Sequence, residues 1–185
     1  SVHREDFVPP RHRKLAFADL PLPLEHGEVM MKPVVEGRML QAVSLAPEDE
    51  VLEIGTGSGF ATACLAALAR EVVSIDRHAD FIERTRGRLA AEGITNVRLE
   101  CADVFAWQPG RLFDAICVTG AVAIEPERFG AWLKPGGRMF IIHGQSPVQE
   151  ALRITRRGDG FHRESLFETD VPYLHGAAPA PHFAF

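Results

Sequence analysis

"EVLEIGTGSGFATACLAALAREVVSID", residues 50–76, places a glycine-rich turn and an alanine-rich segment between two short apolar runs. Residues 50–54 and 71–75 have the composition of buried strands, and residues 58–70 favour a helix because alanine has the highest helix propensity. Two strands connected through a helix form a βαβ unit, in which the strands are parallel. The stretch therefore predicts a parallel sheet with a glycine loop at the carboxyl end of one strand.

The same alternation of strands and helices continues on both sides of this stretch. Apolar spacing and turn residues predict these further elements: helices at 33–46, 79–93 and 125–133, strands at 96–102 and 113–119, a strand at 137–143 after the turn "KPGG", and a hairpin of strands at 150–157 and 161–170. The predicted fold class is α/β, with a doubly wound, mostly parallel sheet that ends in an antiparallel hairpin.

The chain length of 185 residues is typical of one domain, so residues 1–185 are expected to form a single unit. Its parts are an extended amino-terminal arm at 1–32, a βαβ core at 33–145, and a hairpin and tail at 146–185. The arm is expected to be extended because its prolines exclude long helices. In the tail, Phe183 and Phe185 alternate as in a strand that anchors the chain end.

Composition restricts the class of partner and the compartment. The formal net charge is −5 and no basic stripe is concentrated anywhere, which argues against nucleic acid as the main partner. No run reaches the ~18 apolar residues of a membrane span, so no membrane association is expected. Cys64, Cys101 and Cys117 lie apart in apolar segments and are interpreted as small buried hydrophobic residues of a cytoplasmic protein. No group of cysteines or histidines in the sequence has the spacing of metal ligands, so no metal site is predicted.

The glycine loop can be compared with known ligand loops. A phosphate cradle would need a Lys followed by Ser or Thr at its end, and this sequence continues with "FATACL" instead. A dinucleotide fingerprint would need Gly or Ala where Phe60 stands, which weakens that alternative without excluding it. Asp76 closes the second strand, where a carboxylate can accept hydrogen bonds from ribose hydroxyls. Because Glu53 precedes the loop and no basic residue follows before Arg70, a ligand with an ammonium and a sulfonium group is acceptable there.

These motifs resemble those of class I S-adenosylmethionine-dependent methyltransferases, which have a Rossmann-like fold. The resemblance rests on "EIGTGSG", the acid after the second strand, Asp103, "FDAI" and "LKPGG" before a terminal hairpin. More narrowly, "REDFVPP", "LAFADLPLPLEHG", "GTGSGFATACLA" and "VTGAV" resemble the protein-L-isoaspartate O-methyltransferase family over nearly the whole chain. The resemblance implies S-adenosyl-L-methionine as methyl donor, S-adenosyl-L-homocysteine as product, and cofactor contacts from Glu53, Gly55, Thr56, Gly57, Ser58, Gly59, Asp76, Arg77, Asp103 and Val104.

The resemblance also implies an acceptor, a protein or peptide with isoaspartyl residues. A carboxylate is already a nucleophile at neutral pH, so transfer to it needs no general base. The family motif Ile-Ser-x-Pro corresponds here to "MMKP", which puts Met31 at the serine position and Lys32 beside it. We expect Met31, Lys32 and Thr119 at the acceptor side of the site, with Lys32 as a cation near the acceptor carboxylate.

Two alternatives to this function remain open. The protein could methylate a different acceptor, including an unknown small molecule, because Met31 lacks the hydroxyl donor of the family serine. It could also bind the cofactor without transferring the methyl group. Family members carry further helical sequence ahead of the segment that matches "REDFVPP", so part of the groove that receives a peptide is expected to be absent from this chain.

Overall fold

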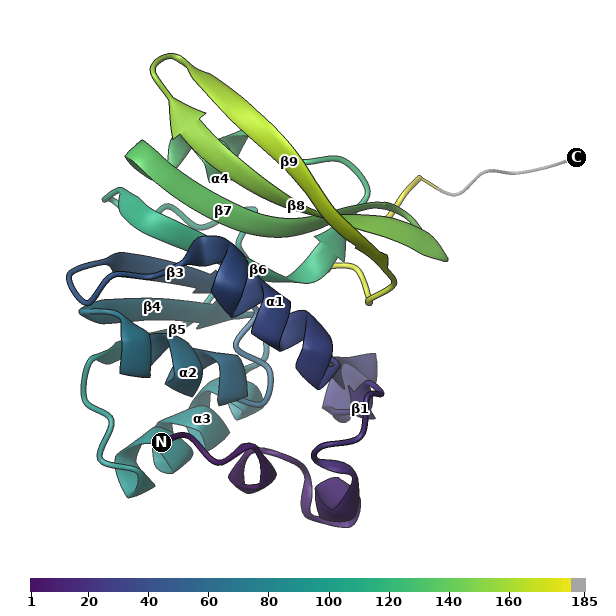
Figure 1. Cartoon of the computed structure of the whole chain (residues 1–185). Helices are drawn as coiled ribbons and strands as arrows, with labels where there is room; N and C mark the ends of the chain where they lie inside the picture. The colour runs from purple at the N-terminus through teal and green to yellow at the C-terminus, as the bar shows by residue number, and fades with distance from the viewer. Residues whose placement is uncertain (181–185) are drawn as a thin grey trace, which may run out of the picture.

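The computed structural model describes residues 1–180, so the predicted terminal strand at Phe183 and Phe185 lies outside the described residues. A seven-stranded sheet with the order β5-β4-β3-β6-β7-β8-β9 runs through the molecule (Figure 1). Its strands are β3 (Glu50–Ile54), β4 (Glu71–Asp76), β5 (Val97–Cys101), β6 (Phe113–Val122), β7 (Leu133–Gln145), β8 (Val148–Arg157) and β9 (Gly160–Thr169). The strands β5, β4, β3, β6 and β7 pair in parallel, each with its neighbour in this order. Strand β8 pairs antiparallel with β7, and β9 pairs antiparallel with β8. The predicted fold class is confirmed.

Helices cover both faces of this sheet because successive side chains of a strand point to opposite sides. Val51 of β3 packs with α1 (Pro33–Val43) and α2 (Phe60–Leu68), whereas its neighbour Leu52 packs in a second cluster with α4 (Glu127–Ala131). The remaining helix, α3 (Ala79–Ala91), contacts β4 and β5. The strand order reverses between β3 and β6, and ligands of open α/β sheets bind at the carboxyl ends of strands at such a switch point.

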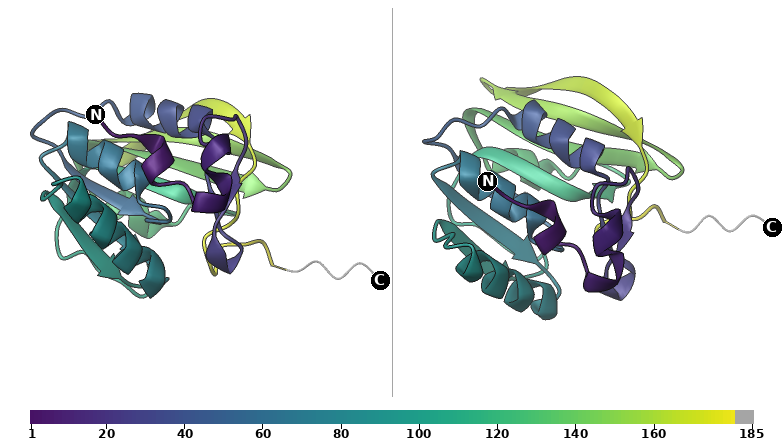
Figure 2. Two further views of the ribbon diagram at one scale, coloured as in Figure 1. Left: turned by 90° about the horizontal axis from the view of Figure 1, so that it is seen from below. Right: turned by 60° about the horizontal axis from the view of Figure 1, so that its bottom comes forward.

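The amino-terminal segment differs from the extended arm that its prolines predict. It contains three 3-10 helices, η1 (Arg4–Asp6), η2 (Pro10–Leu15) and η3 (Glu25–Gly27), and a two-stranded sheet of β1 (Leu22–Pro23) and β2 (Val29–Met30). Proline excludes long α-helices but is compatible with the first turn of a short helix, as at Pro10. Buried residues of this segment, including Phe7 and Leu22, pack with residues of α2 and α3. Figure 2 shows this amino-terminal segment, in purple, on the side of the molecule where α2 and α3 lie.

Two further details of the sequence prediction are wrong. The "KPGG" segment does not precede β7 but lies inside it, because Leu133 already pairs with Phe113 and the register then shifts before Arg138 pairs with Ala115. Within this irregularity Gly136 has φ +79°, which favours glycine. The second error concerns the cysteines. Cys101, in the edge strand β5, is exposed and Cys64 is partly exposed, whereas Cys117 is buried as expected.

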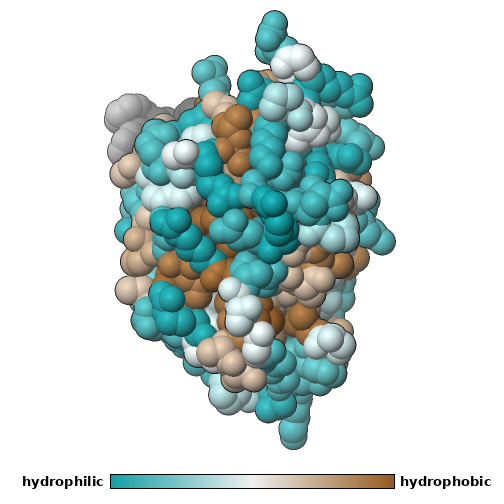
Figure 3. Space-filling view, turned by 90° about the vertical axis from the view of Figure 1, so that its left-hand side faces the viewer, coloured by the Kyte–Doolittle hydropathy of each residue, from teal (hydrophilic) through white to brown (hydrophobic). Residues whose placement is uncertain are grey.

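Charged side chains gather where the strands begin, at the edge opposite the switch point. Glu50, at the start of β3, pairs with Arg70, with Arg111 at 2.8 Å and with Lys134 at 2.9 Å. Figure 3 looks at this side of the molecule and shows a mostly hydrophilic surface with separate small apolar patches. Within residues 1–180, none of the helices combines the length and apolar character needed to cross a membrane.

Candidate active site

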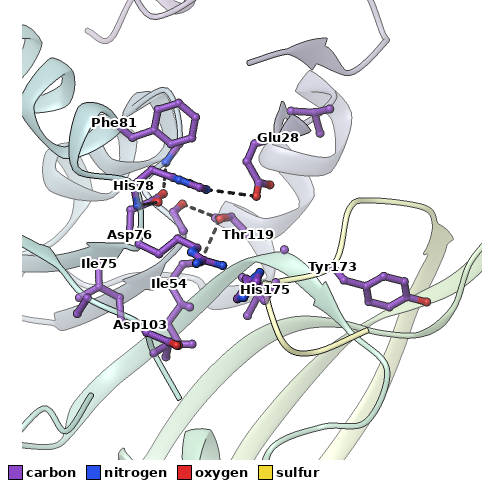
Figure 4. Close-up of a pocket in the computed structure, with 18 residues that line it drawn as sticks. Glu28, Ile54, Ile75, Asp76, His78, Phe81, Asp103, Thr119, Tyr173 and His175 are labelled. Carbon is purple, nitrogen blue, oxygen red and sulfur yellow. Dashed lines mark hydrogen bonds and ion pairs between the residues drawn. The ribbon is translucent and has the colours of Figure 1, made fainter. Parts of the chain in front are cut away.

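A pocket lies at the carboxyl ends of β3, β4, β5 and β6, where the strand order predicts a ligand site (Figure 4). Its wall is formed by six segments that are separate in sequence. They are residues 28–29, residues 54–57 at the end of β3 and in the loop after it, residues 75–81, residues 102–104 after β5, residues 119–120 of β6, and residues 173–175 of the tail. Apolar side chains line much of it, and Glu28, Asp76 and Asp103 supply carboxylates. An apolar wall with a few polar groups is typical of a small-molecule site.

Asp76 connects the end of β4 to the glycine loop. Its Oδ2 accepts a hydrogen bond from the Gly57 N–H at 3.0 Å, and its Oδ1 accepts one from the His78 N–H at 2.9 Å. Each carboxylate oxygen has further lone pairs, so both can still accept a bond from a ligand. Asp76 is nearly buried but lines the pocket, so it is held rigidly at the place where the sequence predicts a ribose contact.

Thr119 fixes the glycine loop from β6. Its hydroxyl group lies 2.6 Å from the carbonyl oxygen of Gly55 and 3.0 Å from that of Ile54, and can donate to either. Gly55 has φ +99°, and a Cβ atom added there would overlap Thr119 Oγ1. Thr119 also lines the pocket, as its predicted acceptor role requires, but its hydroxyl group is hydrogen-bonded to the backbone of the loop.

Glu53 lies beneath the loop and does not line the pocket. It is fully buried, and its Oε2 accepts hydrogen bonds from the hydroxyl groups of Thr62 and Ser74, both at 2.5 Å. Among the described residues its Oε1 has no hydrogen-bond partner. Burial is the main reason that the pKa of Glu53 is raised to about 8, and the charge of Asp76 also raises it. Thr56 joins this network through a contact of 2.6 Å between its hydroxyl group and that of Ser74.

The last part of the loop faces α3. Gly59 precedes α2 with φ +84°, and a Cβ atom there would lie 2.6 Å from Thr85 Oγ1. The carbonyl oxygen of Ser58 accepts a hydrogen bond from Arg88 at 2.7 Å. Ser58 and Gly59 thus hold the start of α2 against α3 and do not line the pocket.

Met31 and Lys32 also lie outside the pocket lining. Met31 is buried in the cluster that includes α1, and its carbonyl oxygen accepts a hydrogen bond from Arg4 at 2.8 Å. Lys32 is half-buried and immediately precedes α1. Arg4 additionally forms a buried ion pair with Glu36 of α1. The acceptor role of Met31 and Lys32 stays a prediction.

The structure thus brings part of the predicted set together around one pocket. The residues that line it are Gly55, Gly57, Asp76, Arg77, Asp103, Val104 and Thr119. Asp103 is exposed just after the end of β5, and its Oδ1 accepts a hydrogen bond from the Phe105 N–H at 3.0 Å. Val104 is buried and adds to the apolar wall.

Several lining residues are not found by sequence reasoning. Tyr173, Leu174 and His175 come from the tail, which is pinned to β6 by a hydrogen bond of 2.8 Å from the Leu174 N–H to the Ala121 carbonyl oxygen. Glu28 and His78 also line the pocket. The position of His78, two residues after Asp76 at the same sheet edge, is a signal that could have found it. Burial raises the pKa of Glu28.

The family model for protein-L-isoaspartate(D-aspartate) O-methyltransferase matches residues 1–174. The protein-L-isoaspartate O-methyltransferase of Methylorubrum extorquens is 42% identical over 183 residues, which are 97% of this chain and 80% of that protein. The enzyme of the same name from Dictyoglomus thermophilum is 37% identical, over 89% of this chain and 76% of its own length.

A solved structure has the same fold at low sequence identity. The putative protein-L-isoaspartate O-methyltransferase of Plasmodium falciparum, in complex with S-adenosyl-L-homocysteine, superposes with a TM-score of 0.81 at 20% identity and covers 94% of this chain and 86% of its own. These matches confirm the resemblance that the sequence motifs indicate. Because the family model covers nearly the whole chain, this protein belongs to the protein-L-isoaspartate O-methyltransferase family.

Proposed function

We propose that this protein transfers a methyl group from S-adenosyl-L-methionine to the carboxylate of isoaspartyl residues in proteins. The observation that carries the proposal is the family match over residues 1–174 together with a pocket in which Gly55, Gly57, Asp76 and Thr119 meet. The chain spans most of the length of its relatives, so the comparison extends beyond the cofactor half of the fold.

The pocket suits the methyl donor chemically. Ile54, Ile75 and Val104 supply apolar surface for a nucleoside, and the oxygens of Asp76 can accept bonds from its hydroxyl groups. Glycines with positive φ after β3 let the ligand approach the backbone closely. Gly55, Gly57, Asp76, Arg77 and Asp103 would hold the cofactor, which supplies a methyl group activated by its sulfonium when it is bound.

The chain's own residues then have to position the reactants and exclude water. The tail residues Tyr173 and Leu174 line the pocket together with Thr119, and the Tyr173 hydroxyl group is fixed by donating to the Gly144 carbonyl oxygen at 2.9 Å. Such positioning can account for a large share of a rate enhancement. An acceptor carboxylate is ionised at neutral pH, so this reaction needs no general base.

Met31 supports a second candidate, a methyltransferase with a different acceptor. A methionine side chain has no donor for a carboxylate, and here it is 4% exposed. Losing one hydrogen bond of this kind costs about 1 to 3 kcal/mol, or roughly one to two orders of magnitude in rate.

Two measurements test the proposal. Calorimetry with S-adenosyl-L-homocysteine and with NAD tests the pocket, and tight binding of NAD alone would overturn the cofactor assignment. Transfer of a tritiated methyl group to an isoaspartyl peptide and to its normal aspartyl twin tests the acceptor. We expect incorporation only into the isoaspartyl peptide; equal or zero incorporation into both would favour the other candidates.

The Met31→Ser variant separates a missing donor from a missing acceptor site. We expect a roughly tenfold or greater gain with the isoaspartyl peptide, because the hydroxyl group restores the lost hydrogen bond. Met31→Ala is the matched control, since it removes the same bulk without adding a donor. An equal gain in both variants would mean that space, rather than hydrogen bonding, limits the reaction.

A further inference from the structure

Two histidines and an aspartate from distant parts of the chain lie together beside the pocket. The potential metal-binding atoms of His26, His78 and Asp80 all lie within 4.8 Å of one another. His26 belongs to η3, whereas His78 and Asp80 stand at the start of α3. The Nε2 atom of His26 is 2.9 Å from Asp80 Oδ1, within hydrogen-bonding distance.

The surroundings supply further features of a metal site. Glu28 Oε1 lies 3.7 Å from His78 Nε2 and can serve as a fourth donor (Figure 4). Arg84 approaches the other oxygen of Asp80, at 3.5 Å, and leaves Oδ1 toward His26. Groups outside the ligand set that orient a ligand in this way are a regular part of metal sites. Two imidazoles with one or two carboxylates are typical zinc ligands.

The two histidine rings are stacked, with centroids 4.0 Å apart and planes inclined by 2°. The lone pairs of parallel rings lie in parallel planes and cannot meet at one ion, so coordination requires one ring to turn. His26 is the ring that can do so, because its side chain is 41% exposed compared with 20% for His78. Its backbone has φ +62°, in the left-handed region.

We infer that His26, His78 and Asp80, with Glu28 as a fourth donor, form a zinc site that joins the η3 turn to the start of α3. When Zn²⁺ binds, the rings of His26 and His78 no longer stack on each other. Glu28 and His78 also line the cofactor pocket, so the ion fixes one wall of that pocket. The inference concerns a separate ligand, and it does not depend on which acceptor is methylated.

Calorimetric titration of the full chain with zinc chloride tests the site. We expect one Zn²⁺ per chain and an affinity that falls at least about tenfold in His26→Asn and in His78→Asn. Asparagine is chosen because it tolerates the left-handed backbone of His26. His162→Asn, at an exposed position of β9, is the matched control and should bind as the wild type does. Cys101→Ser should also bind normally, which excludes the exposed thiol as the ligand.

Thermal unfolding separates loss of ligands from loss of fold. Zn²⁺ should raise the unfolding temperature of the wild type and of His162→Asn, but not of the two cluster variants, because an ion that binds only the native state stabilises it. If a histidine variant is already destabilised without zinc, Asp80→Asn serves as the second variant. No binding by the wild type, equal binding by all variants, or loss of binding only in Cys101→Ser overturns the inference.

Discussion

Replacing Glu53 by Gln tests how a fully buried carboxyl group supports the glycine loop. The side chain has no exposed surface, accepts hydrogen bonds from Thr62 and Ser74 through one oxygen, and has no partner for its other oxygen among the described residues. Burial raises its pKa from 4.5 to about 8. At neutral pH the native state therefore keeps a proton on Glu53 that the unfolded chain has released.

The sign and size of the effect follow from this difference. Between pH 4.5 and 8 the native protein binds more protons than the unfolded chain, so stability must fall as pH rises and level off above about 8. At 1.36 kcal/mol for each pKa unit, the loss between pH 5.5 and 8.5 is about 3 kcal/mol. Gln is neutral at every pH, so Glu53→Gln should remove this slope and gain about 3 kcal/mol on the wild type over that range.

The assay is guanidinium unfolding of the cofactor-free protein at pH 5.5, 7.0 and 8.5, followed by circular dichroism. Cofactor is left out because a ligand of the native state would add its own stabilisation. Glu164→Gln, at an exposed position whose carboxylate is not buried, is the control and should follow the wild type. A difference between wild type and Glu53→Gln that stays constant within about 0.5 kcal/mol across this range would refute the reasoning.

Three further predictions concern the pocket and the amino-terminal segment. Asp76→Ala should weaken S-adenosyl-L-homocysteine binding at least about tenfold, because it removes a ligand acceptor and the partner of the Gly57 N–H; unchanged affinity in calorimetry would contradict this. Gly55→Ala should lower the unfolding free energy by about 1 to 3 kcal/mol through its φ of +99° and its overlap with Thr119, and a second change, Thr119→Ala, should recover part of the loss in denaturant unfolding. Glu36→Gln leaves Arg4 buried without a counter-charge and should cost about 3 to 5 kcal/mol; a loss below about 1 kcal/mol in the same assay would show that the ion pair contributes little.

The sheet could be predicted because its signals are local. Apolar strands, an alanine-rich helix and glycines at turns occur in the order that parallel βαβ units require. Prediction failed where local signals compete with tertiary pairing. "KPGG" has the composition of a turn, yet Leu133 before it is held in β7 by pairing with Phe113. The prolines of the amino-terminal segment exclude long helices but do not exclude the short 3-10 turns that pack on α2 and α3.

The residues of the candidate site that lie at the ends of strands could be predicted from the sequence. Gly55, Gly57, Asp76 and Asp103 lie at or within three residues of the carboxyl ends of parallel strands, which share one edge, so their meeting at one pocket follows from the fold class. The presence of Tyr173 in the pocket wall could not be predicted in the same way. It depends on how a tail far away in sequence pairs with β6, which periodicity does not encode.

The sequence by itself determined the sheet, the glycine loop and the acid at the end of β4, because each depends on residues that are neighbours in the chain. Only the tertiary structure decided that Glu53 is buried beneath the loop and that Met31 packs in the core. It also decided that His26 lies against His78, although no spacing in the sequence indicates a metal site. Burial and the meeting of distant segments depend on the packing of the whole chain, whereas strand and turn signals depend on a few adjacent residues.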